Sequence, residues 1–345
     1  MKAMGFLQHG NYEVLKELTL DDPRISDSNV LIKIDNTSVN TLDIMTRNGI
    51  PGFNFKMPHI PGSDIIGKIE EIGKNVNNFS VGEKVIVNTV YGCDNCYYCK
   101  SGEEQRCPSW KCLGLQVDGS YAELISVPSS SISKIPKGFS DEELASMPLH
   151  VPLAWKNIKK LAKAVEGETI LIRGASGLVG IFAIQLSLAL KLNVIALSGS
   201  PEKEQQLKKL GKITLISSKK TNEELIKEVM DLTNNKGVDI ILDSFGSTIG
   251  NSIDLAGYNS RIISFGVLTG IESTLNVKKL YLKNISIIGT HNASKIDFDE
   301  SFDFASKNNI HPIIGSFFNI KEISKAHQAF EKHEFFGKIV IKNRF

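Results

Sequence analysis

The second half of the chain alternates short hydrophobic runs with amphipathic segments. Segments of helical character, such as Pro201–Gly211 and Asn222–Leu232, lie between several of these runs. Strands that alternate with helices at this spacing predict one doubly wound parallel sheet of six strands. The predicted strands are Glu168–Arg173, Asn193–Leu197, Ile213–Ile216, Val238–Leu242, Arg261–Phe265 and Ile285–Ile288.

A glycine-rich turn, GASGLVG at Gly174–Gly180, follows the first of these strands, and the apolar segment after it suits a helix buried against a sheet. A strand, a glycine turn and a helix form the first half of a dinucleotide-binding unit, in which the backbone approaches a pyrophosphate. An α/β domain that binds no nucleotide is the alternative. The predicted cofactor site comprises Gly174, Ser176, Gly177, Leu178, Val179, Gly180, Ser198, Ser200, Lys203, Phe245, Gly266 and Val267.

The end of the second strand bears on which dinucleotide binds. NAD-binding forms of this unit usually place an acidic side chain there, on the ribose 2′-hydroxyl. Here the strand leads into Ser198-Gly199-Ser200-Pro-Glu-Lys203, with no carboxylate at its end. Two hydroxyl donors and an ammonium group favour the 2′-phosphate of NADP. The alternative is an ordinary helix start, of which Ser-Pro-Glu is also typical.

Four of the five cysteines, Cys93, Cys96, Cys99 and Cys107, follow the spacing C-x2-C-x2-C-x7-C. Thiolates two residues apart can converge on one tetrahedral zinc ion, and four protein ligands leave no open position for water or substrate. The predicted metal is therefore structural. An iron–sulfur cluster and four unrelated cysteines are the alternatives. The remaining cysteine, Cys112, is interpreted as a small packed residue.

Composition and charge narrow the class of protein. A length of 345 residues suggests about two domains. The 40 basic and 38 acidic residues are spread along the chain, so neither nucleic acid nor a membrane surface is an expected partner. The longest uncharged run, Gly174–Leu190, is too short and too interrupted to span a bilayer, and the N-terminus lacks a signal-peptide core. These features predict a soluble cytoplasmic protein that acts on a small molecule.

Taken together, these features resemble the medium-chain dehydrogenase/reductase superfamily over essentially the whole chain. The motifs that carry the resemblance, besides the cysteine loop and the glycine turn, are Phe79–Val85 (FSVGEKV), Asp118–Glu123 (DGSYAE), Gly237–Gly246 (GVDIILDSFG) and Gly337–Asn343 (GKIVIKN).

The resemblance implies an α/β fold with three parts. A GroES-like β-barrel catalytic domain would span 1–152, with the four-cysteine zinc lobe at about 92–112. A Rossmann domain with a six-stranded parallel sheet would span 153–290, and a return segment at 291–345 would complete the catalytic domain. The resemblance also implies a homodimer or homotetramer, often formed through the edge strand of the Rossmann sheet, here Lys283–Gly289.

The sequence departs from the zinc alcohol dehydrogenases of that superfamily at the three positions that the resemblance assigns to catalytic zinc ligands. Asn40 stands for a cysteine, Ser63 for a histidine, and Leu149 at the third position. An amide, a hydroxyl and an aliphatic side chain do not make a zinc site. An unorthodox catalytic zinc site is the alternative, and its ligands would come from Asp64, His59 and His150.

The stretch Val39-Asn40-Thr-Leu-Asp43 resembles the zinc-free quinone and enone reductases, which implies that Asn40 lies near the nicotinamide and that Asp43 helps to orient the site. Because conjugated acceptors spread the charge onto oxygen, amide donors can replace a Lewis acid. We therefore expect an NADP(H)-dependent reductase of activated double bonds or quinones, in which Asn40 donates to the oxyanion and Ser63 or a water helps proton delivery. The alternative for Asn40 and Asp43 is a helix-capping pair. The alternative functions are an alcohol or aldehyde oxidoreductase and a non-enzymatic NADPH sensor.

Overall fold

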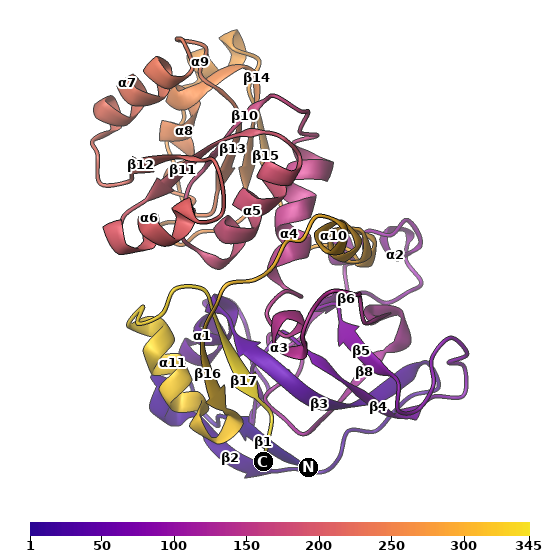
Figure 1. Ribbon diagram of the computed structural model, residues 1–345. Helices are drawn as coiled ribbons and strands as arrows, with labels where there is room; N and C mark the ends of the chain where they lie inside the picture. Colours follow the sequence, from indigo (N-terminus) through magenta and orange to yellow (C-terminus); the bar gives the residue numbers. More distant parts are fainter. The chain divides into compact units, whose positions relative to one another are not determined.

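The computed structural model describes residues 1–345, which divide into two compact units. Unit 1 combines Met1–Pro152 with Asn292–Phe345, and unit 2 is Leu153–His291. The chain thus leaves unit 1, builds unit 2 and returns, and the returning segment is yellow in Figure 1. No helix is both long enough and apolar enough to cross a membrane.

Unit 2 contains the six-stranded parallel sheet that the hydrophobic pattern predicts. The strand order is β12-β11-β10-β13-β14-β15, with helices on both sides of the sheet (Figure 1). This order reverses direction at β10, which is the arrangement of Rossmann sheets. Its elements are β10 (Thr169–Ile172), α5 (Leu178–Ala189), β11 (Asn193–Ser198), α6 (Pro201–Lys208), β12 (Thr214–Ser217), α7 (Asn222–Leu232), β13 (Val238–Asp243), α8 (Ile249–Leu255), β14 (Ala256–Ser264), α9 (Val277–Leu282) and β15 (Ser286–Gly289).

The boundaries follow local chemistry. Helix α7 begins with a capping box between Thr221 and Glu224, which satisfies backbone N–H groups of the first turn. Strand β14 begins five residues before the predicted Arg261, because its first residue pairs with Val238 across a register shift. A bulge of this kind interrupts the alternation on which strand prediction depends. The predicted fold class, an α/β protein with a doubly wound sheet, is confirmed.

Unit 1 is built around a seven-stranded sheet. The strands follow the order β16-β17-β3-β4-β5-β9, and β8 also pairs with β3. Its elements are β1 (Lys2–Gly5), β2 (Lys16–Thr19), β3 (Asn29–Val39), α1 (Thr41–Asn48), β4 (Ile66–Ile72), β5 (Lys84–Val87), β6 (Val90–Tyr91), α2 (Tyr97–Lys100), β7 (Lys111–Cys112), β8 (Leu124–Pro128), β9 (Ile132–Lys134), α3 (Asp141–Leu144), α4 (His150–Trp155, which runs into unit 2), α10 (Lys295–Lys307), β16 (Ile314–Asn319), α11 (Ile323–Glu331) and β17 (Lys338–Lys342).

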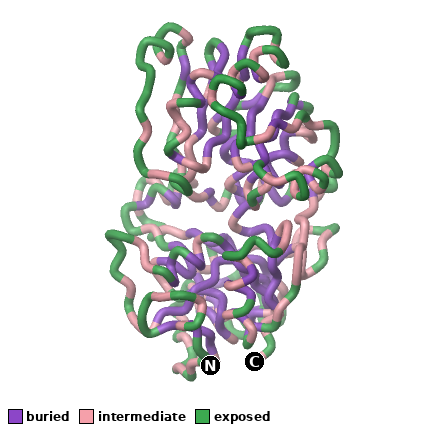
Figure 2. Tube along the Cα trace, turned by 90° about the vertical axis from the view of Figure 1, so that its left-hand side faces the viewer, coloured by how far each residue is buried: buried purple, intermediate pink, exposed green.

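The returning segment is an integral part of the unit 1 sheet. Strand β17 pairs antiparallel with β3, and Ile339 lies opposite Val39. Gly337, directly before this strand, has a φ of +96°, and a Cβ at this position would lie 2.1 Å from the carbonyl oxygen of Ile313. Only glycine fits there. The buried residues, drawn in purple in Figure 2, form several hydrophobic clusters in unit 1, around Ile339, Ile32 and Leu115, and a cluster around Leu171 in unit 2.

Candidate active site and metal centre

Asn40 and Asp43 lie where β3 ends and α1 begins. Asn40 is the N-cap residue of α1, and its backbone N–H donates to Oδ2 of Asp43 at 2.8 Å. This bond satisfies an N–H group at the helix start, as the capping alternative expects. Both side chains are nevertheless fully buried and make further contacts. They therefore belong to a polar cluster inside the sheet as well as to a helix cap.

Asp43 accepts hydrogen bonds from three directions. The hydroxyl of Ser63 donates to its Oδ1 at 3.1 Å, and the hydroxyl of Tyr121 donates to its Oδ2 at 3.1 Å. Burial raises the pKa of Asp43 from 3.8 to about 7, against the lowering effect of the Asn40 N–H, and the nearby charge of Asp64 raises it further. The structure thus brings the three predicted catalytic residues, Asn40, Asp43 and Ser63, together.

A chain of hydrogen bonds leads from Asp43 to the surface through Tyr121, His327 and Arg47. Arg47 only donates, and its Nη1 lies 3.1 Å from Nδ1 of His327. Burial holds the pKa of His327 well below its usual value, so the ring is neutral and its proton lies on Nε2. That nitrogen lies 3.1 Å from the Tyr121 hydroxyl, and Arg47 pairs with Glu331 at 2.6 Å. Arg47 therefore donates to His327, His327 to Tyr121, and Tyr121 to Asp43.

Asp64 lies on the other side of Asn40 and is also fully buried. Its Oδ2 accepts from Ser38 Oγ at 2.5 Å, from Asn40 Nδ2 at 3.0 Å and from Nζ of Lys338 at 2.8 Å. Its Oδ1 accepts from the backbone N–H of Leu149 at 2.9 Å. Burial opposes ionisation of Asp64, but the charge of Lys338 and these hydrogen bonds outweigh it and hold its pKa below the usual value.

Lys338 also belongs to this site, although the sequence assigns it no role beyond its place in the motif Gly337–Asn343. It begins β17, it is 1% exposed, and its Nζ also donates to Oδ1 of Asn40 at 2.5 Å. Because Ile339 pairs with Val39, the sheet register places Lys338 beside Asn40. Its signal in the sequence is a lysine at the start of an otherwise apolar strand, KIVIK.

The residues proposed for an unorthodox zinc site do not converge. The Nε2 atom of His59 lies 3.1 Å from the carbonyl oxygen of Gly114, and its ring packs against Phe55. His150 is buried near the charges of Asp64 and Lys338, burial lowers its pKa to about 3, and its Nδ1 has no hydrogen-bond partner. These residues do not form a group with ligand atoms close enough for one ion.

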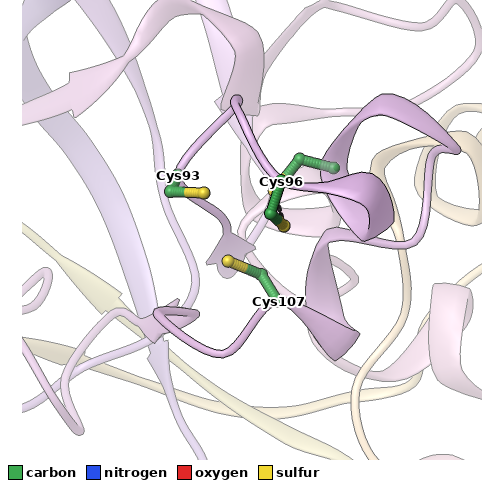
Figure 3. A group of neighbouring side chains, drawn as sticks. Cys93, Cys96 and Cys107 are labelled. Atoms are coloured by element: carbon green, nitrogen blue, oxygen red, sulfur yellow. Dashed lines mark hydrogen bonds between the residues drawn. The ribbon is translucent and has the colours of Figure 1, made fainter.

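The four-cysteine group does converge. The Sγ atoms of Cys93, Cys96, Cys99 and Cys107 all lie within 4.8 Å of one another, and Figure 3 shows three of them turned towards one another. Zinc–sulfur bonds of about 2.3 Å place the sulfurs of a tetrahedral site about 3.8 Å apart, so this arrangement fits a zinc ion. A Cβ on Gly92 would lie 2.3 Å from the Cys99 sulfur, which explains the glycine that precedes the cluster.

In unit 2, the predicted glycine turn has the close backbone approaches that a dinucleotide site requires. Gly174 has a φ of +69°, and Gly177 is the N-cap of α5, so Ser176 lies in the turn and Leu178 and Val179 open the helix. A Cβ on Gly180 would lie 2.5 Å from the carbonyl oxygen of Gly174. The helix N-terminus is therefore packed directly against the turn, as pyrophosphate binding needs.

The other predicted cofactor residues follow the ends of neighbouring strands. The ring of Phe245 lies next to Gly174, since a Cβ on that glycine would lie 3.3 Å from it. Gly266 approaches the Ser244 carbonyl, where a Cβ would lie at 2.5 Å, and Val267 beside it is exposed. The structure therefore places Phe245 against the turn and Gly266 beside Ser244, which also lies next to Gly174.

Ser198 and Ser200 lie at or just after the end of β11, where the sequence predicts the contact with the cofactor ribose. Ser200 caps α6 by accepting from the Lys203 N–H at 3.5 Å, and its hydroxyl donates to Glu202 at 2.5 Å. Ser198 ends β11 and is buried. The helix-start alternative therefore describes Ser200 correctly. The last residue of β11 is a serine, so no carboxylate lies at the strand end.

Comparison with known proteins finds the same two domains and relatives that are dehydrogenases and reductases. The family model "Alcohol dehydrogenase GroES-like domain" matches residues 26–137, and the model "Zinc-binding dehydrogenase" matches residues 179–307. Acryloyl-coenzyme A reductases from Sulfurisphaera tokodaii and Metallosphaera sedula are each 29% identical, over 93% and 99% of this chain and 94% and 99% of their own. A crystal structure of an NAD-dependent alcohol dehydrogenase superposes with a TM-score of 0.93 at 28% identity, covering 100% of both chains.

A GroES-like domain joined to a Rossmann sheet defines a class of oxidoreductases. The chain belongs to the medium-chain dehydrogenase/reductase superfamily, as its motifs indicate. Members of this superfamily bind nicotinamide cofactors.

Proposed function

We propose that the chain is an NADP(H)-dependent reductase that transfers hydride to an activated carbon–carbon double bond, with one structural zinc ion on the four cysteines and no catalytic zinc. The observation that carries this proposal is the content of the polar cluster in unit 1. Where the zinc alcohol dehydrogenases would hold a metal, an amide, a hydroxyl, two carboxylates and an ammonium group are linked by hydrogen bonds.

The substrate class that we favour is an α,β-unsaturated carbonyl compound, including thioesters. The resemblance to two acryloyl-coenzyme A reductases over nearly the full chain supports it. A quinone is a second acceptor with the same electronic demand, since charge also moves onto an oxygen. An alcohol or aldehyde is the second candidate class, which the likeness to an NAD-dependent alcohol dehydrogenase supports.

The proposed roles follow from the hydrogen bonds. Asn40 has one amide N–H on Asp64 and one without an acceptor, and the second would donate to the carbonyl oxygen as it gains charge. Ser63 donates to Asp43, so these two residues would deliver a proton to the α carbon. Bound NADPH would supply the hydride to the β carbon. The products are NADP⁺ and the saturated compound, and the proton comes ultimately from solvent.

We base the preference for NADP on the end of β11. No carboxylate stands there to occupy the ribose 2′-hydroxyl, and Ser198 and Lys203 offer a hydroxyl and a positive charge. Glu202 counts against NADP, because its carboxylate accepts a hydrogen bond from Ser200 and brings a negative charge to this position. Substituting Ser198→Asp would place an acid at the strand end. We expect NADPH affinity to fall by at least tenfold while NADH affinity rises.

The experiment that tests the function is a turnover panel. Purified protein is given NADPH or NADH with an enoyl thioester, an enone, a quinone and an aldehyde, and oxidation is followed at 340 nm, where reduced nicotinamide absorbs. Elemental analysis on the same sample gives zinc per chain. We expect turnover with the unsaturated carbonyl compounds and one zinc. Turnover of the aldehyde alone, with two zinc ions, would overturn the proposal. Tight NADPH binding without any turnover would favour a non-enzymatic sensor.

A further inference from the structure

The orientation of the Asn40 amide is fixed by two neighbours of opposite character. An asparagine side chain has an oxygen that accepts and an NH₂ group that donates, and the two are nearly isosteric. The Lys338 ammonium can only donate, so it must face the oxygen, and it does so at 2.5 Å. The ionised Asp64 carboxylate can only accept, so it must face the NH₂ group, which it does at 3.0 Å.

Because Lys338 also donates to Asp64 at 2.8 Å, the three side chains close a ring in which Lys338 donates to both partners and Asp64 accepts from both. All three are buried, and the sheet positions each: Asn40 directly follows β3, Asp64 lies two residues before β4, and Lys338 starts β17 beside the end of β3. If the amide flipped, its NH₂ group would meet an ammonium group and its oxygen a carboxylate. Both contacts are repulsive, so the ring permits one orientation.

We propose that Lys338 is a positioning residue for the reduction: it locks the Asn40 carboxamide so that one N–H of Asn40 stays directed away from Asp64 and available to the substrate oxygen. This inference rests on the proposed function, but it concerns a role for Lys338 that the resemblance does not supply. The positive charge has a second effect, since it offsets Asp64 and leaves the ring close to neutral. An oxygen that gains negative charge then meets a donor rather than a bare carboxylate.

The test is a set of variants measured with the enoyl thioester. Lys338→Met removes the charge and keeps the chain length, and Asp64→Asn/Lys338→Met removes both charges, so no ion is left buried alone. The matched control is Lys342→Met on the same strand, whose side chain is 40% exposed. We expect kcat to fall roughly 100-fold in both Lys338 variants, the size of effect that losing one oxyanion donor has. NADPH affinity should stay within about twofold, and the control should be unchanged.

A double-mutant cycle tests whether Lys338 acts through Asn40. Asn40→Ala alone should lower kcat roughly 100-fold. If Lys338 acts by holding Asn40, then adding Lys338→Met to Asn40→Ala should cost little more. Full additivity of the two losses would overturn the inference. So would unchanged kcat in Lys338→Met, or a loss of NADPH affinity with kcat retained, which would make Lys338 a cofactor ligand instead.

A readout without turnover keeps this inference separate from the proposed function. The Asn40 side-chain NH₂ signals of ¹⁵N-labelled protein are identified by their absence in Asn40→Ala. In the unsubstituted protein, the hydrogen on Asp64 should exchange slowly with solvent, and in Asp64→Asn/Lys338→Met both hydrogens should exchange fast. Equal protection in both proteins would contradict the locking role. If no unsaturated substrate is turned over while this protection is observed, the proposed function fails and the locking role stands.

Discussion

Unit 1 holds two sites that the superfamily resemblance associates with metal. In each, negative charge has to be offset by a positive charge, and the source of that positive charge differs. The cysteine cluster, Cys93, Cys96, Cys99 and Cys107, gathers four sulfurs from one loop. The lysine site, Asn40, Asp64 and Lys338, gathers its groups from the residue after β3, the segment before β4 and the start of β17, and it contains its own cation. The first needs an added positive ion to offset its thiolates, and the second does not.

The two sites differ in how far apart in the sequence their residues lie, and this separation decides when each site can form. Sulfurs separated by a few residues approach one another through local turns, so the cysteine cluster can form whenever its loop does. The contact between Lys338 and Asn40 spans 298 positions and exists only after β17 has paired with β3. The lysine site therefore depends on the pairing of β17 with β3, whereas the cysteine cluster would depend on the zinc ion proposed for it.

The largest expected effect breaks the cysteine cluster. We expect Cys107→Ser to lose the bound zinc and to lower the free energy of unfolding by several kcal/mol, because metal-binding energy is folding energy for such a loop. Elemental analysis and urea unfolding measure the two effects. Cys112→Ser is the control, since Cys112 is buried outside the cluster and should leave the zinc content unchanged. Unchanged zinc in Cys107→Ser would mean that the cluster does not hold the metal.

The next effect breaks the lysine site. Asp64→Ala leaves the Lys338 ammonium buried without its carboxylate, and removing one partner of a buried ion pair costs about 3–5 kcal/mol of unfolding free energy. Zinc content should not change, which is what separates this site from the cysteine cluster. Asp303→Ala, which breaks an exposed pair with Lys307, should have no measurable effect. A loss as small as that of Asp303→Ala would show that the lysine site contributes little.

A smaller effect tests the donor chain that reaches Asp43. Tyr121→Phe removes a hydroxyl that lies between His327 and Asp43, so the Nε2–H of His327 loses its acceptor. A buried group left without a partner costs about 1–3 kcal/mol. Urea unfolding measures it, with Tyr258→Phe as the control because that side chain is exposed. Equal stability of the two variants would contradict the order of donors described above.

The last effect is a pH dependence that separates Asp43 from Asp64. Because the pKa of Asp43 is raised from 3.8 to about 7, the folded state binds more protons than the unfolded state between these values. Stability from Asp43 is therefore present below about pH 4 and is lost as pH rises through about 7, by up to about 1.4 kcal/mol per pH unit. Asp64, whose pKa is lowered, acts in the opposite sense, and its contribution is lost in acid below about pH 4.

Urea unfolding of the unsubstituted protein and of Asp43→Asn at pH 5, 6 and 7 isolates this effect. As pH rises, the unfolding free energy of Asp43→Asn should increase relative to that of the unsubstituted protein. Asp64, Lys338 and the Tyr121 hydroxyl face Asp43; the lowered pKa of Asp64 and the raised pKa of Tyr121 keep these two groups from titrating in this window. A difference that stays constant across the three pH values would show that Asp43 is ionised throughout.

Much of the fold could be predicted because its signals are local. Hydrophobic runs mark the six strands of unit 2, and the glycine turn marks the start of α5. Asn40, Asp43 and Ser63 were also predicted, from short motifs that resemble known ones, and the structure places them in one cluster. Their predicted catalytic roles stay predictions.

The rest of the candidate site could not be predicted because it depends on strand register. Tyr121, His327 and Lys338 reach the cluster across 78 to 298 positions of sequence, and one sequence does not give the pairing of β17 with β3. Ser200 illustrates the opposite limit. Its motif supported both a helix cap and a phosphate contact, and the structure shows the cap.

The division of unit 1 into two stretches of sequence has a consequence for synthesis of the chain. Asn40 and Asp64 leave the ribosome early, but their partner on β17 follows only after all of unit 2 has been made. Until then, the edge of β3 that pairs with β17 stays open, and open edges invite association with other chains. A chain that stops before residue 338 would carry the glycine turn and the cysteine cluster, yet it would lack the residue that orients Asn40. The site is therefore complete only once residue 338 has been synthesised and β17 has paired with β3.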